Sequence, residues 1–218
     1  MCKPFIRNHD YNFINKQADY VLHALRTVGD PKIVASVRSE AQAKVAELFA
    51  EITDERSTML ASIADLQSTE DFQKYMQLLE PYRDEFPSLA AKDILKLFPK
   101  VKKLKLPDLA HLDYRKLSYL SWADIATNRM YIVYPSGDGQ FIGLEGRYTA
   151  SSKKSYCFAC NRLEEVVLFS ANFKKRPVHA SPDYYKTIGN YICANGHTCN
   201  KNITSVASLE RFIEAVVG

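Results

Sequence analysis

Two short cysteine motifs decide the fold of this chain. They are Cys157-Phe158-Ala159-Cys160 and, after 32 intervening residues, Cys193-Ala194-Asn195-Gly196-His197-Thr198-Cys199. The first is a CxxC pair and the second a C-x5-C pair. Zinc prefers four soft ligands in a tetrahedron, and two short loops that carry two thiols each can supply them. The predicted ligands are Cys157, Cys160, Cys193 and Cys199.

The residues around the motifs indicate how the site is built. Tyr156 leaves a strand-like segment and Asn161 turns back, as in a zinc knuckle. The second motif follows another strand-like segment, and residues 194–198 can form the first turn of a helix. A knuckle, a hairpin and ligands at a helix start make the order of a treble-clef finger. Four thiolates close the coordination shell, so we expect one structural zinc rather than a catalytic one.

Other interpretations of the thiols stay open. They could form disulfides or remain idle, although residues 1–8 lack an apolar signal segment and disulfides are rare in the reducing cytosol. His197 or His179 could replace one cysteine as ligand. The fifth cysteine, Cys2, is interpreted as an exposed terminal thiol. We expect a cytoplasmic protein.

Composition allows one large or two small domains in 218 residues. The formal charge of +4 is mild and is compatible with an acidic partner or a ribosomal surface. Apolar runs stay well short of the ~20 residues of a membrane helix, so we expect no membrane contact.

The first 80 or so residues carry apolar side chains at helical spacing. Helices are predicted over residues 10–28 and 31–52, then from Thr53 or Asp54, and then after a capping box of Ser68 and Asp71. Short connections predict an antiparallel four-helix bundle, interpreted as a structural or interaction domain. The apolar stripe of the second helix consists of Ile33, Val34, Val37, Ala41, Val45, Leu48, Phe49 and Ile52.

Pro81 and Pro87 mark the predicted domain boundary. Residues 1–82 form the helical bundle, and 83–218 form a mixed α/β domain whose finger covers about 150–218. A short helix is predicted over 89–98, capped by Ser88. The strand predictions are a hairpin over 129–134 and 140–148 and two strands over 165–173 and 189–193. A final helix runs to Val217, giving an α+β protein.

Lysines alternate with apolar residues between 96 and 107. One interpretation is an edge strand whose lysines face water and discourage aggregation. The other is a basic rim that meets RNA or an acidic protein face.

Enzyme motifs do not occur in the sequence. The glycines at 137, 139, 143 and 146 belong to the hairpin and form no phosphate loop, and HExxH and GxSxG patterns are missing. We therefore predict a binding protein with no catalytic residues and no small-molecule substrate.

Three segments together resemble a known family. Residues 100–107, residues 122–134 and the four cysteines are similar, in order and spacing, to the FusB/FusC-type fusidic acid resistance proteins, also called elongation factor G-binding proteins. The resemblance spans the whole chain. It implies a four-helix bundle followed by an α/β domain with a treble-clef-like zinc finger, in which the four cysteines match the family's zinc ligands.

The resemblance also implies a function. Such proteins bind elongation factor G, promote its release from ribosomes on which fusidic acid has stalled it, and leave the drug unmodified. Elongation factor G is thus the expected partner, with a possible contact to the ribosome. Resistance of this kind is target protection and needs no enzyme activity.

Aromatic residues with a nearby lysine are common interface anchors. Around the finger, Tyr191 and Phe212 are predicted to be core residues by strand and helix phase. The residues expected to be exposed and to contact the partner are Tyr156, Phe158, Tyr185, Lys186 and Leu209.

The main alternative is a zinc-finger protein that binds ribosomal RNA or another nucleic acid. The basic residues that favour it are Lys100, Lys102, Lys103, Lys105, Lys153, Lys154, Lys174, Lys175 and Arg176. A surface adhesin is a further possibility, which the absence of a signal segment opposes. An uncharacterised enzyme would require an open position on the zinc.

Overall fold

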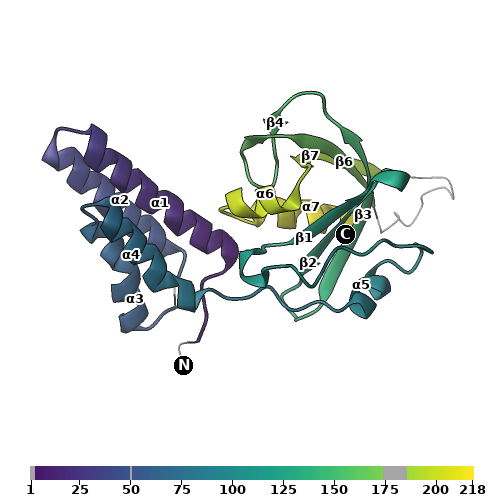
Figure 1. Ribbon diagram of the computed structural model, residues 1–218, viewed down its shortest axis with the longest axis horizontal. Helices are drawn as coiled ribbons and strands as arrows, with labels where there is room; N and C mark the ends of the chain where they lie inside the picture. The colour runs from purple at the N-terminus through teal and green to yellow at the C-terminus, as the bar shows by residue number, and fades with distance from the viewer. Residues whose placement is uncertain (1–2, 50, 174–185) are drawn as a thin grey trace. The chain divides into compact units, whose positions relative to one another are not determined.

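The computed structural model describes residues 3–49, 51–173 and 186–218. The chain divides into two compact units, Met1–Asp84 and Glu85–Gly218 (Figure 1). Each has its own hydrophobic core.

The first unit is helical. Its α-helices are α1 Asn8–Thr27, α2 Pro31–Glu47, α3 Asp54–Ala61 and α4 Thr69–Leu79, with 3-10 turns η1 at Ser62–Asp65 and η2 at Glu80–Tyr82. Helix α1 packs against α2 and α4, and α2 packs against α3 and η1. Ile14, Val21 and Leu79 are fully buried where these helices meet. The helical nature of the N-terminal region, predicted from the apolar spacing, is confirmed.

Two predicted helix starts are also confirmed. Asp30 Oδ1 accepts a hydrogen bond from the Lys32 backbone N–H at 2.8 Å, with Pro31 in the first helical position of α2. Ser68 Oγ accepts one from the Asp71 backbone N–H at 3.1 Å and so caps α4. These side chains satisfy backbone donors that a helix leaves unpaired at its start.

The second helix differs from its prediction in where it ends and in the burial of Ile33. It ends at Glu47 rather than residue 52, because Phe49 and Ile52 pack against the core from the segment after the helix. The apolar pattern therefore continues where the helix does not. Ile33 is 52% exposed, since α2 joins the core cluster only from Val37 onward. Its predicted inward position is wrong.

The second unit is built on a five-stranded antiparallel sheet in the order β1-β2-β3-β6-β7. A separate hairpin pairs β4 with β5. The strands are β1 Leu120–Asp124, β2 Arg129–Pro135, β3 Phe141–Ala150, β4 Ser155–Tyr156, β5 Leu163–Glu164, β6 Val166–Asn172 and β7 Thr187–Cys193. The predicted hairpin of β2 and β3 is present, with Met130 opposite Gly146.

Helices and loops cover both faces of this sheet. The helices are α5 Ala91–Leu97, α6 Gly196–Asn202 and α7 Ala207–Val217, with 3-10 turns at η3 Tyr114–Lys116 and η4 Ile125–Thr127. Met130 and Ile132 of β2 belong to the same core cluster as α7 and the cysteines. Tyr131 and Val133 point to the other side, where they pack in the cluster that contains Ile94 of α5. Successive side chains of β2 thus point alternately into two hydrophobic cores, one on each side of the sheet.

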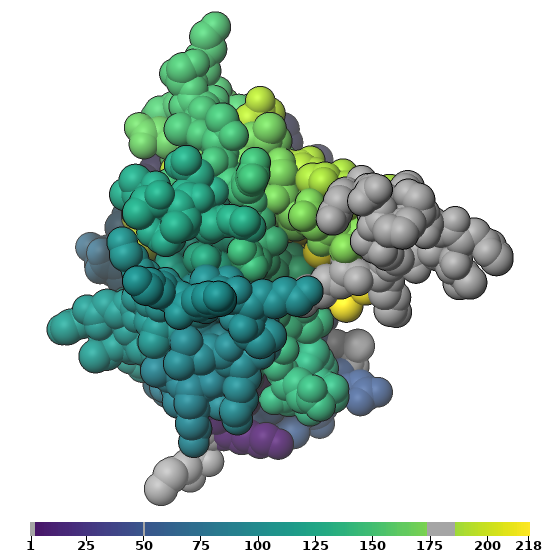
Figure 2. Space-filling model, turned by 90° about the vertical axis from the view of Figure 1, so that its right-hand side faces the viewer, coloured from purple at the N-terminus to yellow at the C-terminus, as the bar shows by residue number. Residues whose placement is uncertain are grey.

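The lysine-rich segment is not an edge strand, so that prediction is wrong. Residues 98–113 form turns and irregular backbone at the surface, in the teal part of the chain in Figure 2. Val101 and Leu104 pack against the cluster around Phe98, and Trp122 Nε1 donates a hydrogen bond to the Lys105 carbonyl at 2.8 Å. Lysines and apolar residues alternate here because Val101 and Leu104 pack inward from irregular backbone, and not because the segment is a β-strand.

The short helix α5 also starts later than predicted. Its N-cap is Ala90 rather than Ser88, and Asp93 Oδ2 accepts a hydrogen bond from the Ala90 backbone N–H at 3.3 Å. Asp93 in the first turn therefore satisfies the backbone N–H of the N-cap residue, and the predicted role of Ser88 as N-cap is wrong.

Candidate metal centre

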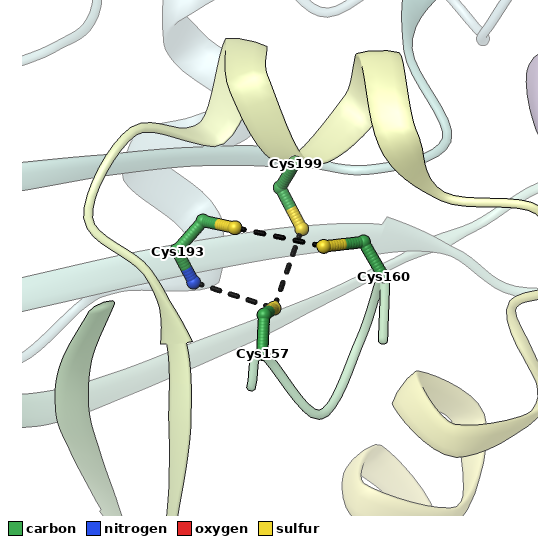
Figure 3. Close-up of side chains that lie close together, drawn as sticks. All are labelled: Cys157, Cys160, Cys193 and Cys199. Carbon is green, nitrogen blue, oxygen red and sulfur yellow. Dashed lines mark hydrogen bonds between the residues drawn. The ribbon is translucent and has the colours of Figure 1, made fainter. Parts of the chain in front are cut away.

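Four cysteine thiols converge inside the second unit (Figure 3). Cys157 and Cys160 lie in the turn between β4 and β5, Cys193 ends β7, and Cys199 lies in α6. All four sulfurs lie within 4.8 Å of one another. Among the described residues this is the one group of three or more histidine, cysteine or acidic side chains that is close enough to share an ion.

The distances between these sulfurs fit a shared zinc ion and exclude disulfides. Cys157 Sγ lies 3.7 Å from Cys199 Sγ, and Cys160 Sγ lies 3.6 Å from Cys193 Sγ. A disulfide would bring two sulfurs to about 2.05 Å. A tetrahedron with Zn–S bonds of about 2.3 Å has edges of about 3.8 Å. The four thiols therefore form the site of one structural zinc.

The histidine alternatives are decided in part. His197 is exposed and is not part of the sulfur cluster. His179 lies outside the described residues. Because four sulfurs already complete the tetrahedron, neither histidine is needed as a ligand.

The knuckle depends on a tight turn. Asn161 adopts a left-handed backbone conformation, with φ of 52°, and its N–H donates to the Cys157 carbonyl at 2.8 Å. The Cys157 N–H in turn donates to the Arg162 carbonyl at 3.0 Å. Asparagine tolerates left-handed backbone better than most residues, so this residue type suits the turn that brings the two thiols together.

The longer C-x5-C spacing is explained by the start of α6. Asn195 caps the helix: its Oδ1 accepts from the His197 N–H at 2.8 Å and from the Thr198 N–H at 3.4 Å. Cys193 lies before the cap at the end of a strand, whereas Cys199 lies one turn into the helix. The end of β7 and the first turn of α6 thus bring the sulfurs of Cys193 and Cys199 close together.

Asn200, which the sequence did not single out, fixes α6 to the segment that leads into β1. Its Oδ1 accepts from the backbone N–H groups of Ser118, at 2.6 Å, and Tyr119, at 3.3 Å. Its Nδ2 donates to the Tyr119 carbonyl at 2.9 Å. The side chain is only 2% exposed. Because Asn200 follows Cys199 directly, these bonds also hold the fourth sulfur in place.

Replacing Asn200 by alanine is expected to destabilise the second unit by about 3 kcal/mol, since several buried backbone groups would lose their partner. Urea unfolding followed by fluorescence measures this change. Asn202→Ala is the matched control: it removes one half-buried bond, from Nδ2 to Glu164 Oε1 at 2.9 Å. We expect that variant to lose about 1 kcal/mol. Equal losses in the two variants would contradict the proposed role of Asn200.

Crowding of the four thiols controls their ionisation. Hydrogen bonds from the other thiols, that of Cys160 first, lower the pKa of Cys157. Hydrogen bonds that involve Cys157 raise the pKa of Cys193 and of Cys199. The thiols therefore do not ionise together by themselves, whereas a dication favours the thiolate form of all four. Because protons compete with the metal, zinc affinity falls with acid.

The structure separates the five residues expected at the partner surface. Tyr156 is 65% exposed and Lys186 is also exposed. Phe158 is half-buried, with its ring 5.1 Å from that of Phe212. Tyr185 lies outside the described residues. Leu209 is fully buried, so its predicted exposure is wrong.

Of the two aromatic residues expected in the core, one is buried and the other is exposed. Phe212 is 3% exposed, as predicted. Tyr191 is 43% exposed and lies opposite Leu168, itself 38% exposed, on the outer side of the sheet. Its predicted burial is wrong because Ile192, not Tyr191, takes the inward position of β7.

Next to the finger lies an open groove of about 310 Å³, here called the finger groove. It is lined by Phe158, Ile188, Asn190, Ser208, Arg211 and Phe212. Of these, the sequence analysis proposed Phe158 alone as a partner contact. Arg211 stands at the polar side of the groove, where its Nη2 donates to Ser208 Oγ at 3.2 Å. The groove joins apolar and cationic groups from β7, α7 and the knuckle.

No helix in the part of the chain that the structure describes is both long and apolar enough to cross a bilayer.

Comparisons with known proteins agree with this architecture. Residues 5–87 match the family described as "Elongation factor G-binding protein, N-terminal", and residues 99–214 match the "FBP C-terminal treble-clef zinc-finger". A solved structure described as "Structure of the fusidic acid resistance protein FusC" is 26% identical, with a TM-score of 0.81 over 97% of both chains. A comparison with curated proteins finds no match. The two family matches lie in order and together cover most of the sequence, and the chain therefore belongs to the FusB/FusC-type family of elongation factor G-binding proteins.

Proposed function

We propose that this protein binds elongation factor G in the cytoplasm and promotes its release from ribosomes on which fusidic acid holds it. The observation that carries the proposal is the similarity to FusC over nearly the full length of both chains. The protein protects the target and performs no chemistry on the drug or on the factor.

Release by binding alone is physically sufficient. A factor trapped on the ribosome exchanges between a bound and a dissociation-prone state. A protein that prefers the dissociation-prone state shifts this equilibrium by the difference between its two affinities. Because nothing is consumed, one molecule acts repeatedly. Added in substoichiometric amounts to ribosomes stalled with the factor, GDP and fusidic acid, the protein is expected to move the factor into the unbound fraction on sedimentation. Release of only one factor per added molecule would contradict repeated action.

The finger groove is the proposed contact surface, together with Tyr156 and Lys186. Phe158 and Ile188 offer apolar surface, and Arg211 offers a planar cation that pairs with carboxylates. Lys186 Nζ lies 4.6 Å from the centroid of the Phe173 ring, which holds a second cation near the start of β7. Aromatic residues and arginine are the residue types enriched at interface hot spots.

Arg211→Ala is expected to weaken binding of elongation factor G by roughly thirtyfold, because truncation of an interface arginine commonly costs about 2 kcal/mol. Lys186→Ala is expected to act in the same direction. Calorimetric titration with the factor from the same host measures both, with zinc content checked in each variant. Lys92→Ala removes an exposed lysine from α5 and is the matched control. Unchanged affinity for both surface variants, with wild-type binding intact, would exclude this surface; absence of binding by the wild type would overturn the function itself.

A second candidate function, binding to ribosomal RNA, is favoured by the lysine-rich segment. Lys100, Lys102 and Lys103 are exposed, and within the described part of the chain no acidic side chain pairs with them. The bond from Trp122 to the Lys105 carbonyl anchors the segment. When binding depends on phosphate contacts, the logarithm of the binding constant falls linearly with the logarithm of the salt concentration. A steep salt dependence that persists without elongation factor G would favour this function over the first.

A further inference from the structure

Charge at the metal centre requires compensation. A zinc ion with four thiolates carries a formal charge of about −2. The four cysteines are at most 5% exposed, so water does not solvate that charge. Buried anionic groups are stabilised by hydrogen bonds from nearby donors. One donor is visible: the Cys193 backbone N–H points to Cys157 Sγ at 3.4 Å.

No described backbone N–H donates to Cys199 Sγ in the same way, but the core cluster that holds the four cysteines also contains a buried hydroxyl. Tyr119 is 0% exposed and belongs to the core cluster that contains all four cysteines. Its hydroxyl has no hydrogen-bond partner within the described residues. Asn200 holds the backbone of Tyr119 through the bonds described above, so the residue next to Cys199 also positions Tyr119.

The electrostatics agree with this placement. Burial raises the pKa of Tyr119 well above 10, and the negative charge on Cys199 is the next cause, ahead of Cys157 and Cys193. A buried hydroxyl without a partner costs about 1–3 kcal/mol, whereas phenylalanine would fill the same space without this cost. A thiolate acceptor removes that penalty.

We propose that the Tyr119 hydroxyl donates a hydrogen bond to the zinc-bound thiolate of Cys199 and thereby strengthens zinc binding. It acts as a positioning residue and does not touch the metal. Donors of this kind orient a ligand and spread its charge, and their loss commonly lowers metal affinity about 10- to 100-fold.

Tyr119→Phe in the full chain tests the proposal. Zinc affinity, measured by competition with a chelator, is expected to fall about 10- to 100-fold. In the cobalt-substituted protein the sulfur-to-metal charge-transfer band is expected to move to longer wavelength, because a thiolate without its hydrogen bond gives up electrons more readily. A merely structural role would not move this band. Tyr75→Phe is the matched control: it removes the hydroxyl that donates to the Leu60 carbonyl at 3.0 Å in the helical unit, and should leave both readouts unchanged.

Unchanged affinity and an unchanged band in Tyr119→Phe would overturn the proposal. A measurement on the wild-type sequence guards against a variant that fails to fold. With an NMR-active cadmium isotope in place of zinc, the hydroxyl proton of Tyr119 is expected to show scalar coupling to the metal across the sulfur of Cys199. Absence of this coupling, while the Cys193 amide proton couples across Cys157, would also overturn it.

Discussion

Cys199→Ala is expected to unfold the second unit while the helical unit stays folded. The variant keeps three thiols in a buried site that no longer completes a tetrahedron. Structural zinc contributes on the order of 10 kcal/mol to folding, which is comparable to the entire stability of a typical domain, about 5–15 kcal/mol. The cysteines also join the β4–β5 hairpin, β7 and α6, whose mutual packing depends on them.

Two optical signals separate the units. The chain contains a single tryptophan, Trp122, which lies in β1, so tryptophan fluorescence reports on the second unit. Far-ultraviolet circular dichroism reports mainly on the longer helices of the first unit. We expect the variant to lose the native fluorescence while it keeps most of the helical signal. Cys2→Ala is the control cysteine change. Native fluorescence in Cys199→Ala, or loss of both signals together, would contradict the prediction.

Gly146→Ala is expected to cost about 3 kcal/mol or more, because the added methyl group has no space. Gly146 lies in β3, between Met130 of β2 and Ala171 of β6. A Cβ at this position would lie 2.5 Å from Phe169 Cε2 and 2.5 Å from the Ser170 carbonyl oxygen. The Phe169 ring is fully buried and the carbonyl belongs to the sheet, so neither can yield cheaply.

Gly137→Ala is the matched control in the turn after β2. Apart from its two chain neighbours, no atom of the described residues lies within 4 Å of the position that the added methyl group would take, and the backbone of Gly137 does not adopt a positive φ. We expect that change to stay within about 0.5 kcal/mol. Urea unfolding followed by Trp122 fluorescence compares the two variants. A small loss in Gly146→Ala, similar to that of the control, would show that the sheet can open locally at this position.

Short-range signals were sufficient for the metal centre and the helix starts. The spacing of the cysteines identified all four thiols because zinc geometry constrains ligand type and number, and Asp30 and Ser68 marked helix starts because capping depends on nearby backbone groups. The phase of α7 also indicates that Leu209 is a core residue. Leu209, Phe212, Ile213 and Val216 share one helical face, and all four are buried.

Features that depend on distant contacts could not be predicted. Asn200 reads as an ordinary polar residue until the fold brings Ser118 and Tyr119 beside it, more than 80 positions earlier in the chain. The finger groove likewise combines β7, α7 and the knuckle. The lysine-rich segment resembled a strand because Val101 and Leu104 pack inward from irregular backbone. The spacing of apolar residues along the sequence cannot reveal contacts between distant segments, and it does not distinguish irregular backbone that packs inward from a regular strand.

The two halves of the sulfur cluster are also separated in time. Translation adds roughly 5–20 residues per second, so Cys199 is made roughly 2–8 s after Cys157 and Cys160. During that interval the first two thiols have no complete cage and are open to oxidants, while the completed finger buries its sulfurs. Oxidative damage should therefore fall mainly on newly made chains, before their zinc site is complete. In a growing cell, oxidants would reduce the amount of newly made functional protein and would spare the protein that is already folded.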